Sequence, residues 1–155
     1  MDKSDIKKEV EIELENLDRL VKEMEDLTRR FTNEPDFIQA RAAGSIIHDF
    51  YCGVEKLFER VAVNIDGELP KGEEWHTELL SQMARPLVGI REAVINQDLL
   101  GKLREYLRFR HLFRHIYDFE LKWQRFKTLS LSLSDILSEL KDSFDVLKEA
   151  LDKKP

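Results

Sequence analysis

Apolar residues recur at steps of three and four along residues 37–65, and this pattern restricts the fold more than any other feature. The stripe consists of Phe37, Ala40, Gly44, Ile47, Tyr51, Val54, Phe58, Val61 and Ile65. Such a stripe follows one face of an α-helix of about eight turns and needs another helix to cover it. A similar stripe with charged residues on the other faces predicts an earlier helix over residues 4–30.

Turn-forming segments separate these helices from their neighbours. The first is "FTNEPDF" (31–37), where Asn33 is expected to cap the following helix and Asp36 to lie in its first turn. The second is "DGELPKG" (66–72), after which a short helix is expected over residues 73–84. An irregular or short helical link then leads to the second half of the chain.

The second half is also predicted to be helical. Asn96 is expected to cap a helix that reaches at least Phe119. The serines of residues 128–134 weaken helix there, and Ser132 or Ser134 is expected to cap a last amphipathic helix. No segment long enough to build a sheet alternates with period two. We therefore expect an all-α, up-and-down bundle of four to five helices.

The length of 155 residues suits a single domain, 1–155, around one core. The single cysteine, Cys52, cannot form a disulfide within the chain. The N-terminal residues lack the apolar stretch of a leader, and no run reaches membrane-spanning length. These features predict a cytoplasmic protein that does not associate with membranes.

The charge of the chain is unevenly distributed. The net charge is −6, yet residues 97–127 hold eight Lys and Arg against four Asp and Glu, a local +4 that leaves −10 elsewhere. The overall acidity argues against a general nucleic-acid binder, and no DNA partner is expected. The local basic segment decides what an anionic ligand would meet.

The stretch "RFRHLFRHIYDF" (108–119) places basic residues inside an apolar helix. At about 100° per residue, Arg110 falls within an apolar stripe, with Tyr106 and Phe113 one turn to either side and Tyr117 two turns on. A buried guanidinium without a partner costs several kcal/mol. Either an acid of the core or an anionic ligand must therefore face Arg110.

The histidines follow a second stripe of the same helix, which holds Arg104, Arg108, His111 and His115. His115 lies about 140° around the helix and roughly 7.5 Å along it from Arg110. One rigid helix does not easily direct both side chains at a single phosphate. Two copies that cross at a twofold axis can do so, and this predicts a homodimer.

The combination of histidine and arginine suits metal-free cleavage of RNA. That reaction needs a general base for the 2′-OH, a proton for the leaving 5′-oxygen and a cation for the phosphorane. His111 and His115 have the i, i+4 spacing of zinc ligands, but no nearby Cys or acid pair completes a site. Neither a metal nor another cofactor is expected.

Four residues of this helix form a recognisable motif. Arg110, His111, His115 and Tyr117 read as R-H-x3-H-x-Y. The motif resembles the Rx4-6H signature of the HEPN superfamily, in the HxY form of HepT-like ribonuclease toxins. Supporting similarity continues through "HDFYCGVEKLFERVAVNIDGELPKGEEWHTELL" (48–80) and "FRHLFRHIYDFEL" (109–121), and it spans residues 36–125 in all.

The resemblance implies a helical bundle that dimerises through its motif helices and forms a ribonuclease cleft between them. Arg110 and His115 would be the catalytic pair, and His111 would support them. Tyr117 would be the target of AMPylation by a minimal nucleotidyltransferase antitoxin, whose phosphate would block the cleft.

The RNA itself is expected to meet further basic side chains of the motif helix. These are Arg104, Arg108 and Arg114.

Two alternatives remain open at this point. In one, the chain is a non-catalytic helical partner of a minimal nucleotidyltransferase. In the other, it is a structural bundle in which an acid of the same chain pairs with Arg110. His48 and His76 are expected to be packing or turn histidines, although His76 in "EEWHTELL" resembles a family position without assigned chemistry.

Overall fold

The structure is a computed structural model that describes residues 2–117 and 120–153. Within these ranges it contains six α-helices, one π-helical turn and no strand. The elements are α1 (Lys3–Arg29), α2 (Phe37–Val61), η1 (Ala62–Asp66), α3 (Trp75–Met83), α4 (Gln97–His115), α5 (Trp123–Leu131) and α6 (Leu133–Lys153). The all-α prediction is confirmed, and the helix beyond the expected five is the short α5.

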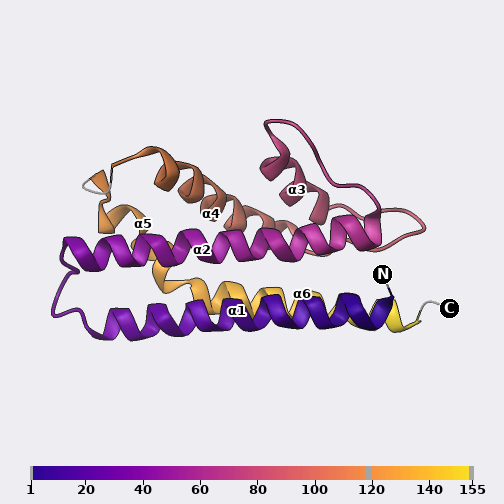
Figure 1. Cartoon of the computed structure of the whole chain (residues 1–155), viewed down its shortest axis with the longest axis horizontal. Coiled ribbons are helices and arrows are strands. Elements are labelled where there is room, and N and C mark those ends of the chain that lie inside the picture. Colours follow the sequence, from indigo (N-terminus) through magenta and orange to yellow (C-terminus); the bar gives the residue numbers. More distant parts are fainter. Residues whose placement is uncertain (1, 118–119, 154–155) are drawn as a thin grey trace.

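The long helices run up and down the bundle (Figure 1). Helix α2 is central: α1 packs along one side of it with α6, while α3 and α4 lie on the opposite side. The start of α1 and the end of α6 lie at the same end of the molecule, where Lys7 pairs with Asp152. None of the described helices is both long and apolar enough to cross a membrane.

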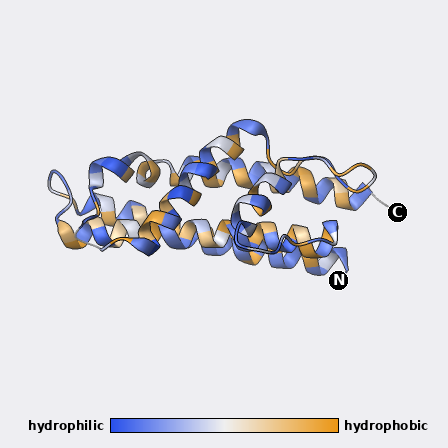
Figure 2. Cartoon of the chain, turned by 90° about the horizontal axis from the view of Figure 1, so that it is seen from above, coloured by the Kyte–Doolittle hydropathy of each residue, from blue (hydrophilic) through white to orange (hydrophobic). Residues whose placement is uncertain are grey.

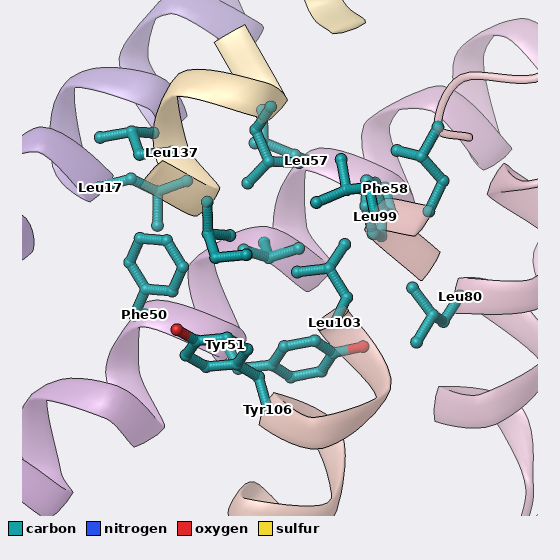
Figure 3. Close-up of a cluster of buried hydrophobic side chains, with 14 of the residues drawn as sticks. Leu17, Phe50, Tyr51, Leu57, Phe58, Leu80, Leu99, Leu103, Tyr106 and Leu137 are labelled. Atoms are coloured by element: carbon teal, nitrogen blue, oxygen red, sulfur yellow. The ribbon is translucent and has the colours of Figure 1, made fainter. Parts of the chain in front are cut away.

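The apolar stripe of α2 forms the middle of the core. Most of its members are fully buried, including Ile47, Tyr51, Val54 and Phe58 at 0% exposure. Leucines and aromatic rings from α1, α3, α4 and α6 surround them (Figure 3). Apolar and polar residues alternate around each long helix (Figure 2), so each helix directs one face to this core.

Helix α2 begins later than the sequence pattern suggests. Its N-cap is Asp36, not Asn33, and Asp36 forms a capping box with Gln39. The backbone N–H of Gln39 donates to Asp36 Oδ1 at 2.8 Å, and the backbone N–H of Asp36 donates to Gln39 Oε1 at 3.0 Å. Two backbone donors are satisfied in this way, which favours Asp36 over Asn33 as the cap.

Helix α4 begins where expected and ends earlier. The Leu99 amide donates to Asn96 Oδ1 at 2.8 Å, so the predicted cap is confirmed. The helix ends at His115, because Ile116 is extended with φ −116° and ψ 159°. The expected continuation to Phe119 is therefore wrong, and Phe119 itself lies outside the described residues.

The early end of α4 brings the following segment back to the core. Leu121 and Phe126 are buried, and the Phe126 ring lies 5.3 Å from that of Phe109. A single residue, Ser132, separates α5 from α6. This break falls within the serine-rich segment, as the sequence predicts.

Candidate functional site

Arg110 lies at the end of the buried face of α4. Leu99, Leu103 and Tyr106 are at most 1% exposed, and Arg110 follows one turn after Tyr106 with its side chain 15% exposed. Arg110 therefore lies on the apolar stripe, as its spacing predicts. Its position between core and surface requires an acidic or anionic neighbour.

That neighbour is Glu55, which α2 presents to α4. The Glu55 side chain is only 7% exposed, and its Oε1 lies 3.6 Å from Arg110 Nε. Arg110 Nε is buried and has no hydrogen-bond partner in the part of the chain that the structure describes. The contact is thus an ion pair without a hydrogen bond, and it is the arrangement that the structural alternative predicts.

Glu55 has a second partner on α3. Its Oε2 lies 2.6 Å from Nδ1 of His76, whose side chain is 23% exposed. The neighbouring Trp75 ring lies with its centroid 3.6 Å from the His76 ring. One buried carboxylate therefore joins an imidazole of α3 and a guanidinium of α4 to α2.

His76 and Arg110 line a cleft of about 620 Å³ between α3, α4 and the segment before α3, and Glu55 lies behind them. The side chains that line it are Glu73, Glu74, His76, Thr77, Arg104, Leu107, Arg108, Arg110 and His111. The cleft thus combines three guanidiniums and two imidazoles with two carboxylates in its lining. Such a surface suits an anionic ligand that also carries hydroxyl or amino groups.

His115 does not line this cleft. It is the last residue of α4, and its exposed ring lies 4.5 Å from the ring of His111. Within one chain, the cleft brings Arg110 together with His111 and His76 but not with His115. This agrees with the sequence prediction that one helix directs Arg110 and His115 to different sides, about 140° apart around its axis.

The remaining predicted site residues occupy different places. Arg104 and Arg108 are exposed along the cleft, and Arg108 pairs with Glu105. Arg114 is exposed near the end of α4 and does not line the cleft. Tyr117 lies beyond the end of the helix and is 71% exposed. It therefore does not lie on the stripe of Arg110, contrary to the sequence prediction.

Comparison with known families decides the assignment. The family model described as HepT-like protein matches residues 42–151 of the chain. The chain belongs to the HepT-like protein family. No curated protein and no solved structure matches it.

The matched span of this HepT-like protein runs from α2 to α6 and includes Glu55, His76 and the complete R-H-x3-H-x-Y motif. It extends beyond residue 125, where the resemblance in the sequence ends, and takes in the last helix. The resemblance to HepT-like proteins of the HEPN superfamily is therefore confirmed.

Negative charge is crowded around Glu55. Glu59 lies one turn further along α2, and its pKa is raised first by burial and then by the charge of Glu55. Tyr51 lies one turn before Glu55; burial raises the pKa of its hydroxyl strongly, and Glu55 adds to the effect. The positive charges of Arg110, which faces Glu55 and Tyr51, and of Arg60, which faces Glu59, oppose this crowding.

Two residues of the site were not assigned to it from the sequence. Glu55 directly follows Val54 of the apolar stripe, and an acid so close to a core needs a partner. His76 was expected to be a packing or turn histidine, but the structure pairs it with Glu55. His48, by contrast, does pack, with its ring 5.4 Å from that of Phe113.

The described residues contain no group of three or more His, Cys, Asp or Glu side chains arranged to hold a metal ion.

Proposed function

We propose that this HepT-like protein is a metal-independent RNA endoribonuclease and the toxin of a toxin–antitoxin pair. The family is that of HEPN-type, toxin-like proteins related to ribonucleases. The observation that carries the proposal is the position of Arg110, whose largely buried side chain lines a cleft together with Arg104, Arg108 and His111.

Arg110 stabilises the phosphorane in this proposal. A guanidinium has five N–H donors in a planar fork, so an edge that faces Glu55 leaves the other edge for phosphate oxygens. Arg104 and Arg108 hold the flanking phosphates, while His111 supports the reacting one. The ion pair with Glu55 is then compatible with catalysis, because it orients the guanidinium without occupying all its donors.

The catalytic pair of Arg110 and His115 requires a second copy of the chain. His115 is exposed at the end of α4, outside the cleft that Arg110 lines. In the proposed homodimer, two α4 helices cross so that His115 of one copy completes the site of the other. Arg114, exposed beside His115, then contacts the RNA from the second copy.

Tyr117 is the proposed point of control. Its side chain is 71% exposed and follows the end of α4 by two residues. AMPylation by a minimal nucleotidyltransferase antitoxin adds a phosphate and a nucleoside there. In the proposed homodimer, where the end of one α4 meets the cleft of the other copy, this charge and bulk block RNA. The pair is proposed to act in the cytoplasm.

Cleavage of RNA in the presence of EDTA tests the proposed activity. We expect Arg110→Ala and His115→Ala to reduce cleavage by about 100-fold or more, because each removes a group that acts in the transition state. Arg19→Ala is the matched control, since Arg19 is exposed on α1, away from the cleft. Cleavage at the wild-type rate by both site variants would exclude the proposed catalytic pair.

Mixing the two variants tests whether the site is shared between copies. If each site takes its arginine from one chain and its histidine from the other, a dimer has two sites. In a heterodimer of Arg110→Ala and His115→Ala chains, one of these sites then lacks both residues and the other has both. An equal mixture should then recover about a quarter of the wild-type activity, since half the dimers are mixed and each has one such site. No recovery in mixed dimers means that the two residues act within one chain.

A second function is favoured by the contact between Arg110 and Glu55 and by the exposure of Tyr117. The ion pair with Glu55 compensates part of the charge of Arg110 without a bound phosphate, and an exposed tyrosine is accessible to a modifying enzyme. A non-catalytic partner of a minimal nucleotidyltransferase would show both features. It would leave RNA intact in EDTA but would still bind the nucleotidyltransferase and be modified at Tyr117.

A further inference from the structure

The contact between His76 and Glu55 has the geometry of a carboxylate–histidine dyad. A carboxylate that accepts the Nδ1–H of a histidine fixes the ring and its tautomer, and it stabilises the imidazolium. Here the carboxylate is buried, the Nδ1 to Oε2 distance is 2.6 Å, and the imidazole is partly exposed at 23%. Because Nδ1 is occupied, Nε2 is the nitrogen that can exchange a proton.

The dyad lies in the same cleft as the arginine of the motif. His76 and Arg110 both line the cleft, and both contact Glu55 through different oxygens of its carboxylate. Among the histidines of the motif, His111 also lines this cleft, whereas His115 does not. The cleft of a single chain thus holds an oriented imidazole beside the guanidinium that is proposed to bind phosphate.

We infer that His76 is a further catalytic residue of this HepT-like protein, the general base of RNA cleavage, and that Glu55 is its positioning residue. This inference rests on the proposed ribonuclease function and adds a group outside the R-H-x3-H-x-Y motif. The substrate class is an RNA strand whose 2′-OH lies beside the phosphate that Arg110 holds.

The reaction step assigns each proton and bond. His76 Nε2 takes the proton of the 2′-OH while the 2′-oxygen forms a bond to phosphorus. The bond from phosphorus to the 5′-oxygen breaks, and a second imidazolium, that of His115 in the proposed dimer, gives its proton to that oxygen. The products are a 2′,3′-cyclic phosphate and a 5′-hydroxyl, and Arg110 compensates the charge on the phosphorane.

The charged groups around His76 favour this role. Glu55 and Glu59 face it from α2, and Glu73 and Glu74 border the cleft just before α3. Arg110 and His111 oppose them from α4. Once His76 has accepted the proton, its imidazolium is held between the buried Glu55 and an acidic rim.

The first test compares two histidine variants in the full-length protein. We expect His76→Gln to lower the rate of RNA cleavage by about 100-fold or more while the helical circular dichroism is retained. His48→Gln is the matched control, because His48 packs against Phe113 and does not line the cleft. Its rate should stay within about twofold of the wild type.

The second test separates positioning from a structural role. In Glu55→Gln the amide no longer stabilises the imidazolium, so the rising limb of the pH–rate profile should move to lower pH. Glu55→Asp should reverse part of that displacement, because it supplies a carboxylate again. A carboxylate that only fastens α3 to α2 would change the amount of folded protein but would leave the limb in place, and that result would overturn the inference.

The outcomes also distinguish the inference from the proposed function. If His76→Gln cleaves at the wild-type rate while Arg110→Ala and His115→Ala are inactive, the role of His76 is wrong and the ribonuclease stands. If the wild type cleaves no RNA, both fail. Should the variants not fold, NMR titration of the wild type with inorganic phosphate decides: the His76 resonances must move together with those of Arg110, and their failure to move overturns the inference.

Discussion

At the scale of single residues, two buried tyrosines show how the surroundings of a hydroxyl determine whether it stabilises or destabilises the native state. Tyr51 and Tyr106 lie in the core between α2 and α4 at 0% and 1% exposure (Figure 3). The Tyr106 hydroxyl donates to the Leu129 carbonyl at 2.7 Å. The Tyr51 hydroxyl has no hydrogen-bond partner among the described residues. A buried hydroxyl without a partner destabilises the native state, whereas a paired one does not.

Removing each hydroxyl should therefore have opposite effects. We expect Tyr51→Phe to raise the free energy of unfolding at pH 7 by about 1 kcal/mol, because it removes an unsatisfied polar group. Tyr106→Phe should lower it by about 1 kcal/mol, because the Leu129 carbonyl loses its donor. Urea denaturation of both variants measures the two changes, and a loss of stability in Tyr51→Phe would show that its hydroxyl does find a partner.

At the scale of elements, a buried ion pair joins η1, the turn that follows α2, to the link between α3 and α4. Asp66, the last residue of η1, accepts two hydrogen bonds from Arg91, at 2.6 and 2.7 Å. Gln82 of α3 donates to the same carboxylate at 2.8 Å. The Asp66 and Arg91 side chains are 0% and 2% exposed. The irregular link is therefore held in place by side-chain contacts, and with it the start of α4.

Loss of this carboxylate should be severe. We expect Asp66→Ala to lower the free energy of unfolding by about 3–5 kcal/mol, because it leaves the guanidinium of Arg91 buried without its counter-ion. Asp18→Ala is the control: its pair with Lys141 is about 40% exposed on each side, and its loss should change stability by less than about 1 kcal/mol. Equal effects of the two substitutions in urea denaturation would contradict the structural role of Asp66.

At the scale of the whole molecule, the core links the stability of the bundle to alkaline pH. Burial raises the pKa of both Tyr51 and Tyr106 well above the ordinary value near 10. In the unfolded chain both hydroxyls titrate at about pH 10. The folded state retains these protons to higher pH, so the contribution of the two tyrosines to stability is constant below about pH 10 and falls above it.

This loss of stability should be measurable as the slope of the free energy of unfolding against pH. Above about pH 10, each buried tyrosine lowers the free energy of unfolding by about 1.4 kcal/mol per pH unit until its folded pKa is reached. We expect Tyr51→Phe to show a shallower decline than the wild type by that amount, in urea denaturation between pH 7 and 11.5. Identical slopes in the two proteins would mean that Tyr51 ionises as readily in the fold as in water.

Much of the fold was predictable because helical periodicity is a local property. The seam of α2, the cap at Asn96 and the place of Arg110 on an apolar stripe follow from neighbouring residues alone. The end of α4 at His115 was not predictable in this way. Residues beyond it have helical periodicity too, but the chain turns so that Leu121 and Phe126 reach the core, and that gain depends on residues distant in sequence.

The sequence by itself determined the all-α class, the family and the motif of Arg110, His111, His115 and Tyr117, because helix periodicity and residue spacing are both read along the chain. Only the tertiary structure decided which acid faces Arg110 and that His76 shares this acid. Glu55, His76 and Arg110 lie on three different helices, and their contact follows from how α3 and α4 pack on α2. Spacing along one chain does not encode the distances between helices, since these depend on the packing of the whole core.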